Sequence, residues 1–184
     1  ASDVYKRQAM EQLNFTHDTS TQYRPQTNGV AERAVQRVKE GTAVTLLQSG
    51  LEDSWWGEAM YCYCFLRNIV DKLSDGQTSY CKRFGQDFRG PVAPFGCEVT
   101  YKPIRPEDVQ RLHPLGQNTL RGIFMGYKQH AGGGWTGDLN IADWDEVEKA
   151  PNHRDIHIKR FKAQEVNAIS NKGIFRFPMR DGSL

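Results

Sequence analysis

The sequence predicts a chain with helices in its first half and short β-strands in its second half. Between residues 28 and 85, hydrophobic residues recur every three or four positions, which is the period of helices with one buried face. After Gly90-Pro91 the period changes, and apolar residues alternate with polar ones as they do in strands. The expected fold class is therefore α/β followed by β, with the change near residue 90.

The N-terminal end holds a segment that we interpret as foreign to the protein. Residues 1–8 read ASDVYKRQ and look like the conceptual translation of a sequencing-library adapter, so they carry no weight in the fold prediction. Residues 9–16 are expected to finish a helix and to enter a short strand, in which Leu13 and Phe15 alternate. A loop over residues 17–27 follows.

A long helix is expected from about residue 28 to residue 48. Asn28 stands where an N-cap belongs, and Gly50 stops the helix. The spacing of its small and apolar residues predicts one buried face, made by Ala31, Ala34, Val35, Val38 and Thr42.

Two further helices are expected before residue 90. Asp53 or Ser54 caps the first of them, and residues 74–76 (Ser-Asp-Gly) end it. Its apolar stripe is predicted to be core rather than a stacking platform for nucleic acid, and consists of Trp56, Ala59, Tyr63, Leu66, Val70 and Leu73. The second is short, capped by Thr78 and closed by Gly85.

Four or five short strands are expected after residue 90. They are marked by Val99 with Tyr101, Ile123 with Met125 and Tyr127, Leu139 with Ile141, and Ile156 with Ile158. Residues 132–134, three glycines, are predicted to be a hairpin turn, because no helix and no Lys-Ser/Thr follows them as in a phosphate-binding loop. The tail is predicted to be a linker or a strand that pairs elsewhere.

The length and composition of the chain restrict its domain number and its possible partners only loosely. A chain of 184 residues suffices for one ordinary domain or two small ones, and 38% hydrophobic with 25% charged residues is typical of globular proteins. The 24 basic and 22 acidic residues give a net charge of +2, which neither requires nor excludes a nucleic-acid partner. We expect no membrane partner and no secretion, since the sequence shows neither a spanning apolar run nor a signal segment.

The cysteines are predicted to be reduced thiols. Cys62 and Cys64 lie in an apolar helical pattern, Cys81 in the short helix and Cys97 at the start of a strand. No C-x-x-C pair accompanies them, so a zinc site is not expected.

Two histidines have the spacing of a helical metal-ligand pair. They are His153 and His157, but Pro151 precedes them and isoleucines flank His157 at both sides. This pattern favours a strand over a metal site.

The segment of residues 17–33 is the most informative part of the chain. Pro25 and Gly29 break a loop, and Glu32 stands in the first turn of the following helix, where the helix dipole alone favours a carboxylate. Glu32, Gln36 and Lys39 form a second stripe on that helix. A carboxylate beside a loop, with an amide and an amine below it, could bind a metal ion and a phosphodiester together.

The residues of this segment, HDTSTQYRPQTNGVAER, resemble the third catalytic block of retroviral and retrotransposon integrases, H-x-x-S-x-x-Y-x-P-Q-x-N-G-x-x-E-R. Residues 78–85 resemble the T-P-Y-E-x-x-F-G segment that closes the catalytic domain in copia-type polyproteins. Residues 94–97 and 122–127 resemble the L-R-V-F-G-C and C-I-F-L-G-Y landmarks of the SH3-like barrel that follows. Together these landmarks favour the copia type over the gypsy type.

The resemblance implies a domain organisation. Residues 9–90 are expected to be the C-terminal, helical part of an RNase H-like integrase catalytic domain. Residues 91–165 are expected to be a small SH3-like β-barrel, and residues 166–184 a linker or tail.

The resemblance also implies a chemistry. Integrases cut and join phosphodiesters with two divalent ions, Mg²⁺ or Mn²⁺, held by an Asp-Asp-Glu triad. Glu32 matches the third carboxylate and is thus the expected catalytic and metal-binding residue. In the family both Asp residues lie upstream, before Ala1 here, and neither Asp3 nor Asp18 takes their role. We expect this fragment to bind no metal and to be inactive, although its parent is an enzyme.

The implied partners are the element ends and the target DNA, with Gln26, Asn28, Gln36 and Lys39 as expected DNA contacts. The intact parent is expected to be an intracellular, nuclear homo-oligomer. Two alternatives stay open: a non-catalytic DNA-binding or assembly module, and a decayed fragment without function.

Overall fold

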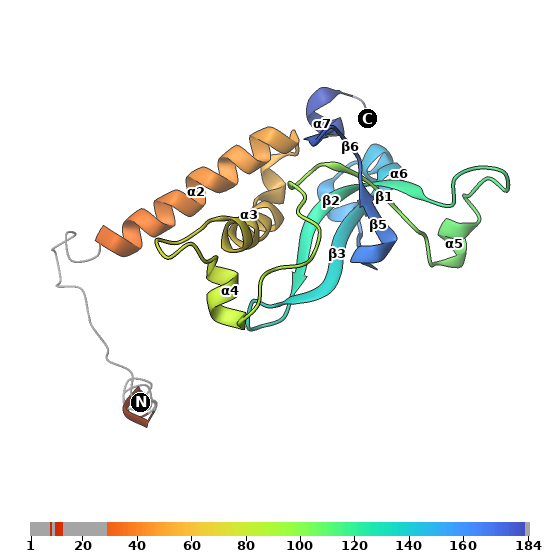
Figure 1. Ribbon diagram of the computed structural model, residues 1–184. Coiled ribbons are helices and arrows are strands. Elements are labelled where there is room, and N and C mark those ends of the chain that lie inside the picture. Colours follow the sequence, from red (N-terminus) through yellow and green to blue (C-terminus); the bar gives the residue numbers. More distant parts are fainter. Residues whose placement is uncertain (1–7, 9, 13–28, 183–184) are drawn as a thin grey trace. The chain divides into compact units, whose positions relative to one another are not determined.

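The computed structural model describes residues 8, 10–12 and 29–182 (Figure 1). By its internal contacts the chain divides into two compact units, residues 1–37 and 38–184. In the first unit, residue 8, residues 10–12 and the opening turns of helix α2 (Gly29–Ser49) are helical. The expected strand at Leu13 and Phe15 and the loop of residues 17–27 lie outside the described residues.

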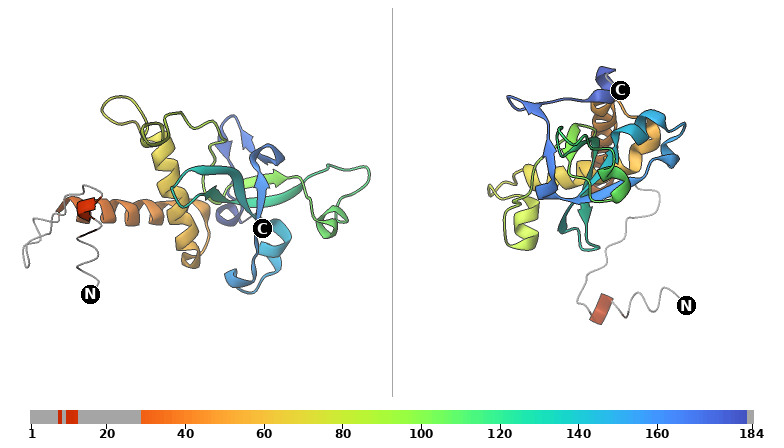
Figure 2. Two further views of the ribbon diagram at one scale, coloured as in Figure 1. Left: turned by 90° about the horizontal axis from the view of Figure 1, so that it is seen from below. Right: turned by 90° about the vertical axis from the view of Figure 1, so that its right-hand side faces the viewer.

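The second unit contains the rest of α2 and all the elements that follow it (Figures 1 and 2). The helices are η2 (Asp53–Trp55), α3 (Trp56–Val70), α4 (Ser79–Phe84), α5 (Pro106–Val109), α6 (Trp144–Lys149), η3 (His153–Asp155), η4 (Ala163–Glu165) and α7 (Pro178–Asp181). The strands are β1 (Glu98–Tyr101), β2 (Leu120–Gln129), β3 (Trp135–Asp143), β4 (Ile158–Lys162), β5 (Val166–Ala168), β6 (Ser170–Asn171) and β7 (Ile174–Phe175).

The predicted ends of α4 and the predicted stop of α2 are confirmed, whereas α3 ends at Val70 and not at the predicted residues 74–76. The Thr78 hydroxyl accepts a hydrogen bond from the Cys81 N–H at 3.1 Å, and Gly85 closes α4 with φ +71°. Helix α2 ends at Ser49, and Gly50 follows with φ +73°. A Cβ on Gly50 would also lie 2.2 Å from the backbone N of Arg180, so the glycine is required by packing as well.

The predicted buried face of α3 is wrong by about one residue. The buried side chains are Ala59, Cys62, Phe65 and Ile69, whereas Trp56 and Val70 of the predicted stripe are 60% and 54% exposed. The face rotates because Trp55, and not Trp56, enters the core, and α3 then lies with Cys62 against Gly126 of β2.

The predicted buried face of α2 is wrong in its first half. Ala31, Ala34 and Val35 are exposed in the first unit. Within the second unit Val38 is half-buried, and burial is complete only at Thr42, Leu46 and Ser49, which are the buried residues of this helix. The spacing of the apolar residues therefore predicts the helix α2 correctly, but it does not predict which part of the helix is buried.

The four expected strands are present as β1 to β4, although β4 begins at Ile158 and leaves Ile156 outside it. With β5, which lies in the segment expected to be a linker or tail, they form a five-stranded antiparallel sheet in the order β4-β3-β2-β1-β5. The glycines of residues 132–134 lie in the turn between β2 and β3, as predicted. Among the described residues the sheet is open, with β4 and β5 as its edges. The strand expected at His153 is wrong, because His153 begins the short 3-10 helix η3.

A single hydrophobic core joins the helices to the sheet. The Phe65 ring of α3 lies 4.5 Å from the Tyr127 ring of β2 and 5.5 Å from the Phe88 ring, centroid to centroid. The Tyr127 hydroxyl donates to the Pro91 carbonyl and accepts from the Ala93 N–H, which fixes the connection between helices and sheet. Residues 38–90 thus pack with the sheet as one unit, and the division into two domains at residue 90 stays a prediction.

The C-terminal segment also enters this core. Phe177 is 5% exposed, and Pro178 is buried beside it. The Arg176 carbonyl accepts a hydrogen bond from the Glu98 N–H at 2.9 Å, which ties the segment to β1. Residues 174–181, expected within a linker or tail, are therefore a packed part of the fold.

The shared core predicts cooperative unfolding. Phe65→Ala should lower the free energy of unfolding by about 3–5 kcal/mol, the usual cost of emptying a buried aromatic site. Amide hydrogen exchange should show equal loss of protection in α3 and in β2. Val44→Ala, at a position 63% exposed, is the matched control and should change stability by less than about 0.5 kcal/mol. Full protection of β2 in the Phe65 variant would show that the sheet folds independently.

A buried ionic network holds the long connection between β1 and β2 against the sheet. This connection carries α5 and projects beyond the strands (Figure 1; Figure 2, left). Arg111 from the connection donates two hydrogen bonds to the fully buried Asp143 at the end of β3, at 2.9 and 3.2 Å. The Tyr101 hydroxyl donates a third, and the N–H groups of Asp145 and Glu146 donate two more as Asp143 caps α6.

Lys159 of β4 extends the same network. Its ammonium donates to both carboxylate oxygens of Asp108 at 3.1 Å and lies 3.1 Å from a Glu146 oxygen. Burial lowers the pKa of Lys159, but hydrogen bonds to Glu146 and Asp108 outweigh this, and the net pKa lies above its ordinary value. Burial likewise raises the pKa of Asp143, and the bonds from Arg111 and Tyr101 reverse the effect, so the net pKa is lowered.

The lowered pKa of Asp143 predicts a pH-dependent stability. An unfolded Asp has a pKa of about 3.9, so the contribution of Asp143 is complete above that pH and is lost as pH falls through the lower folded-state value. Asp143→Asn should cost about 3 kcal/mol at pH 7, measured by urea unfolding, since it leaves a buried pair without its anion.

The cost should shrink at pH 3. Asp71→Asn, which removes an exposed partner of Arg67, is the control and should cost less than about 1 kcal/mol at either pH. An equal loss at pH 7 and pH 3 for the Asp143 variant would contradict the electrostatic origin of its effect.

Candidate functional site

The structure describes three of the five residues predicted for DNA and metal binding. Glu32 lies in the first turn of α2, as the sequence predicts, and is exposed like every residue from Val30 to Arg37. Gln36, further along the helix, is exposed, and so is Lys39, the first of these residues to fall in the second unit. Gln26 and Asn28 lie outside the described residues, so the structure does not test whether they join the others.

A metal centre cannot be assembled from the part of the chain that the structure describes. Within residues 8, 10–12 and 29–182, no three His, Cys, Asp or Glu side chains lie close enough to hold an ion. Glu32 is the predicted metal ligand that the structure describes, and its role in binding a metal stays a prediction.

The thiols lie where the sequence places them, and all four cysteines are free. Burial raises the pKa of Cys97 to about 12 and raises that of Cys62 further. Burial also raises the pKa of the half-buried Cys64. A thiol in this state is neither a nucleophile nor a good metal ligand at neutral pH, because both roles need the thiolate.

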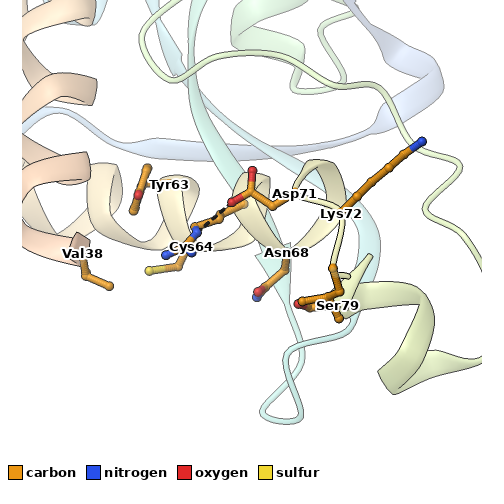
Figure 3. Close-up of a pocket in the computed structure, with 9 residues that line it drawn as sticks. Val38, Tyr63, Cys64, Asn68, Asp71, Lys72 and Ser79 are labelled. Atoms are coloured by element: carbon orange, nitrogen blue, oxygen red, sulfur yellow. Dashed lines mark hydrogen bonds and ion pairs between the residues drawn. The ribbon is translucent and has the colours of Figure 1, made fainter. Parts of the chain in front are cut away.

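A cavity of about 560 Å³ lies beside α3 in the second unit (Figure 3). Residues of α2, of α3 and of the segment that leads into α4 form its walls. They are Val38, Tyr63, Cys64, Arg67, Asn68, Asp71, Lys72, Leu73 and Ser79. Lys39, the predicted DNA contact, directly follows the wall residue Val38.

The walls of this cavity offer hydrogen-bond donors. Arg67 donates from Nε to the carboxylate of Asp71, the C-cap residue of α3, at 2.8 Å. That hydrogen bond raises the pKa of Arg67 above its ordinary value. Lys72 points away from the other labelled side chains (Figure 3). With an amide at Asn68 and a hydroxyl at Ser79 as well, the cavity suits a polar or anionic ligand and presents no nucleophile paired with a base.

The sequence reasoning did not identify this cavity. It assigned Tyr63 to the buried stripe of α3, whereas Tyr63 is half-buried and lines the cavity. The signal was the polar run Arg67, Asn68, Asp71 and Lys72, whose first two residues lie in the last turn of α3 and whose last two directly follow it.

Comparison with known proteins adds no relative: neither the models of known protein families nor the curated proteins match this chain. The helices that the structure describes include none with the length and apolar character needed to cross a membrane. The function is therefore inferred from the residues of this chain.

Proposed function

We propose that the chain is part of a copia-type retrotransposon integrase, in which Glu32 is the third carboxylate of a two-metal centre. The observation that carries this proposal is the match of residues 17–33 to the third integrase block, together with the exposure of Glu32 in the first turn of α2. The substrate is DNA, and the reaction is cleavage and joining of phosphodiesters.

The position of Glu32 suits a metal ligand. Mg²⁺ binds carboxylate oxygens and keeps several of its waters, so its ligands must be accessible, as the exposed Glu32 is. In two-metal catalysis one ion activates the attacking oxygen and the other stabilises the leaving oxygen. A carboxylate at a helix start is fixed in place by the backbone of the helix, while it stays in contact with solvent.

Lys39 and the cavity beside α3 support a DNA partner. Lys39 is exposed, and a lysine contacts a phosphate as a charge without reading the base sequence. The neighbouring cavity contributes Asn68 and the terminal nitrogens of Arg67, which can donate to phosphate oxygens, while the Nε of Arg67 bonds to Asp71. These groups favour contacts along a backbone rather than recognition of one sequence.

The sheet supports the second part of the resemblance. It is an antiparallel meander of four strands, and the fifth strand returns after the 3-10 helix η4 to pair with the first. This strand order is compatible with a small five-stranded SH3-like barrel, and the sheet of the described residues is open. Residues 94–97, which carry the first barrel landmark, directly precede β1, and residues 122–127, which carry the second, lie in β2.

One observation favours a second candidate, a DNA-binding module without catalysis. The cavity beside α3 offers donors and a charged rim but no nucleophile paired with a base. Under this alternative Lys39 matters for binding, whereas Glu32 does not matter for any reaction. Of the three experiments that follow, the Glu32→Gln variant separates the two candidates.

Lys39→Ala should weaken binding to DNA duplexes of unrelated sequence by a similar factor. Because one phosphate contact is lost, the slope of log K against log salt should become flatter by about one. The measurement is fluorescence anisotropy between 50 and 200 mM salt. Lys102→Ala, which removes another exposed lysine, is the control and should leave the slope unchanged. An unchanged slope in the Lys39 variant would mean that this lysine only solvates the helix.

Glu32→Gln, made in an integrase that contains this segment and both upstream Asp residues, should abolish strand transfer with Mg²⁺ or Mn²⁺. DNA affinity should stay within about threefold, since the amide keeps the shape of the side chain. Wild-type rates in the variant would support the binding module instead.

The 184-residue chain alone should neither cleave nor join DNA, because Glu32 supplies one of three carboxylates. Activity of that chain, lost on Glu32→Gln, would show that the other carboxylates lie within it.

A further inference from the structure

A second cavity, of about 650 Å³, lies over the sheet in the second unit. It is formed where α3 crosses β2, and it continues over β3 and β4 to the turn between β2 and β3. The side chains that matter here are Tyr61, Met125, Lys128, His130, Asn140 and Arg160. We call this cavity the sheet groove.

The floor of the sheet groove is apolar and rigid. Met125 and Tyr127 of β2 form it, together with Cys62 of α3, and all three are buried. Gly126 between the two β2 residues has φ +113°, and a Cβ there would lie 3.2 Å from the Cβ of Cys62. The missing side chain lets the helix approach the strand and leaves a shallow apolar surface at their junction.

The sheet groove contains a buried acceptor without a donor. The carboxamide oxygen of Asn140 is buried and has no hydrogen-bond partner among the described residues. Asn140 lies between Gly126 and Arg160 in the strand register, at the centre of the groove wall. Buried oxygens of this kind are normally hydrogen-bonded, and a water or a ligand N–H or O–H can supply the donor.

The rim of the sheet groove is positively charged. Lys128 and Arg160 supply this charge, and neither takes part in the ion pairs formed within the described part of the chain. Glu58, on the α3 side, is a carboxylate among the lining residues. The β2–β4 side is therefore complementary to negative charge, and the α3 side is not.

We propose that the sheet groove binds a short, extended acidic peptide segment of a partner protein. Its carboxylates pair with Lys128 and Arg160, an aliphatic side chain covers the apolar floor, and a backbone N–H satisfies Asn140. This ligand uses all three features of the groove. A DNA backbone would use the charges alone, because phosphodiesters bring neither an N–H donor nor an aliphatic group.

The test uses the full chain and a fluorescein-labelled peptide of alternating Asp and Leu, eight residues long, with fluorescence anisotropy as the readout. A peptide of alternating Asn and Leu is the charge control. The acidic peptide should bind at least tenfold more tightly than its neutral counterpart. Arg160→Glu and Lys128→Glu should each weaken its binding at least tenfold, whereas Arg154→Glu, an exposed arginine outside the groove, should leave it unchanged.

Circular dichroism of each variant establishes that it is folded. Equal binding of the two peptides, or an equal loss in the Arg154 and Arg160 variants, overturns the proposal. A 20-base-pair DNA duplex serves as the competing ligand. If Arg160→Glu abolishes duplex binding and spares the peptide, the groove is a nucleic-acid surface and the peptide proposal is wrong.

Discussion

The buried carboxylate of Asp143 fixes how the strands, the long connection and helix α6 meet. An ion without water is costly unless its oxygens are fully hydrogen-bonded, and here Arg111, Tyr101 and two amides of α6 supply the donors. The donors come from the end of β1, from the connection and from the next helix. All of these donors must reach the same carboxylate at the same time. The network therefore specifies a single arrangement of that end of the sheet.

The other end of the sheet depends on shape instead of charge. There α3 contacts β2 through a glycine, and aromatic rings of Phe65, Phe88 and Tyr127 fill the space around the contact. The charged end holds an exposed connection, whereas the aromatic end leaves a groove with an apolar floor. Two different kinds of interaction thus produce two different kinds of surface on one sheet.

The sequence predicted those features that depend on residues only a few positions apart, such as helix ends and strands. Thr78 and Gly85 set the ends of α4 by their own hydrogen bonds and backbone angles, and alternation marked the strands. The ionic network could not be predicted, because Asp108 and Lys159 are 51 positions apart and only the sheet brings them together. Neighbouring tryptophans likewise hid which face of α3 is buried.

The candidate site follows the same rule. The place of Glu32 in the first turn of α2 was predicted from a short motif, because the motif itself contains the start of the helix. The cavity beside α3 was missed, since its walls combine residues from Val38 to Ser79 that only folding brings together. Metal binding and DNA cleavage remain predictions, because they need residues and partners outside the described part of the chain.

The packing of the C-terminal segment bears on how the protein acquires its structure during synthesis. Phe177 completes the core, and the backbone at Arg180 lies against Gly50 at the end of α2. A ribosome releases the chain from its N-terminal end, so α2 and α3 emerge long before these contacts can form. The second unit therefore reaches its final packing only after translation has passed residue 180, and until then the apolar surface that Phe177 covers stays exposed to water.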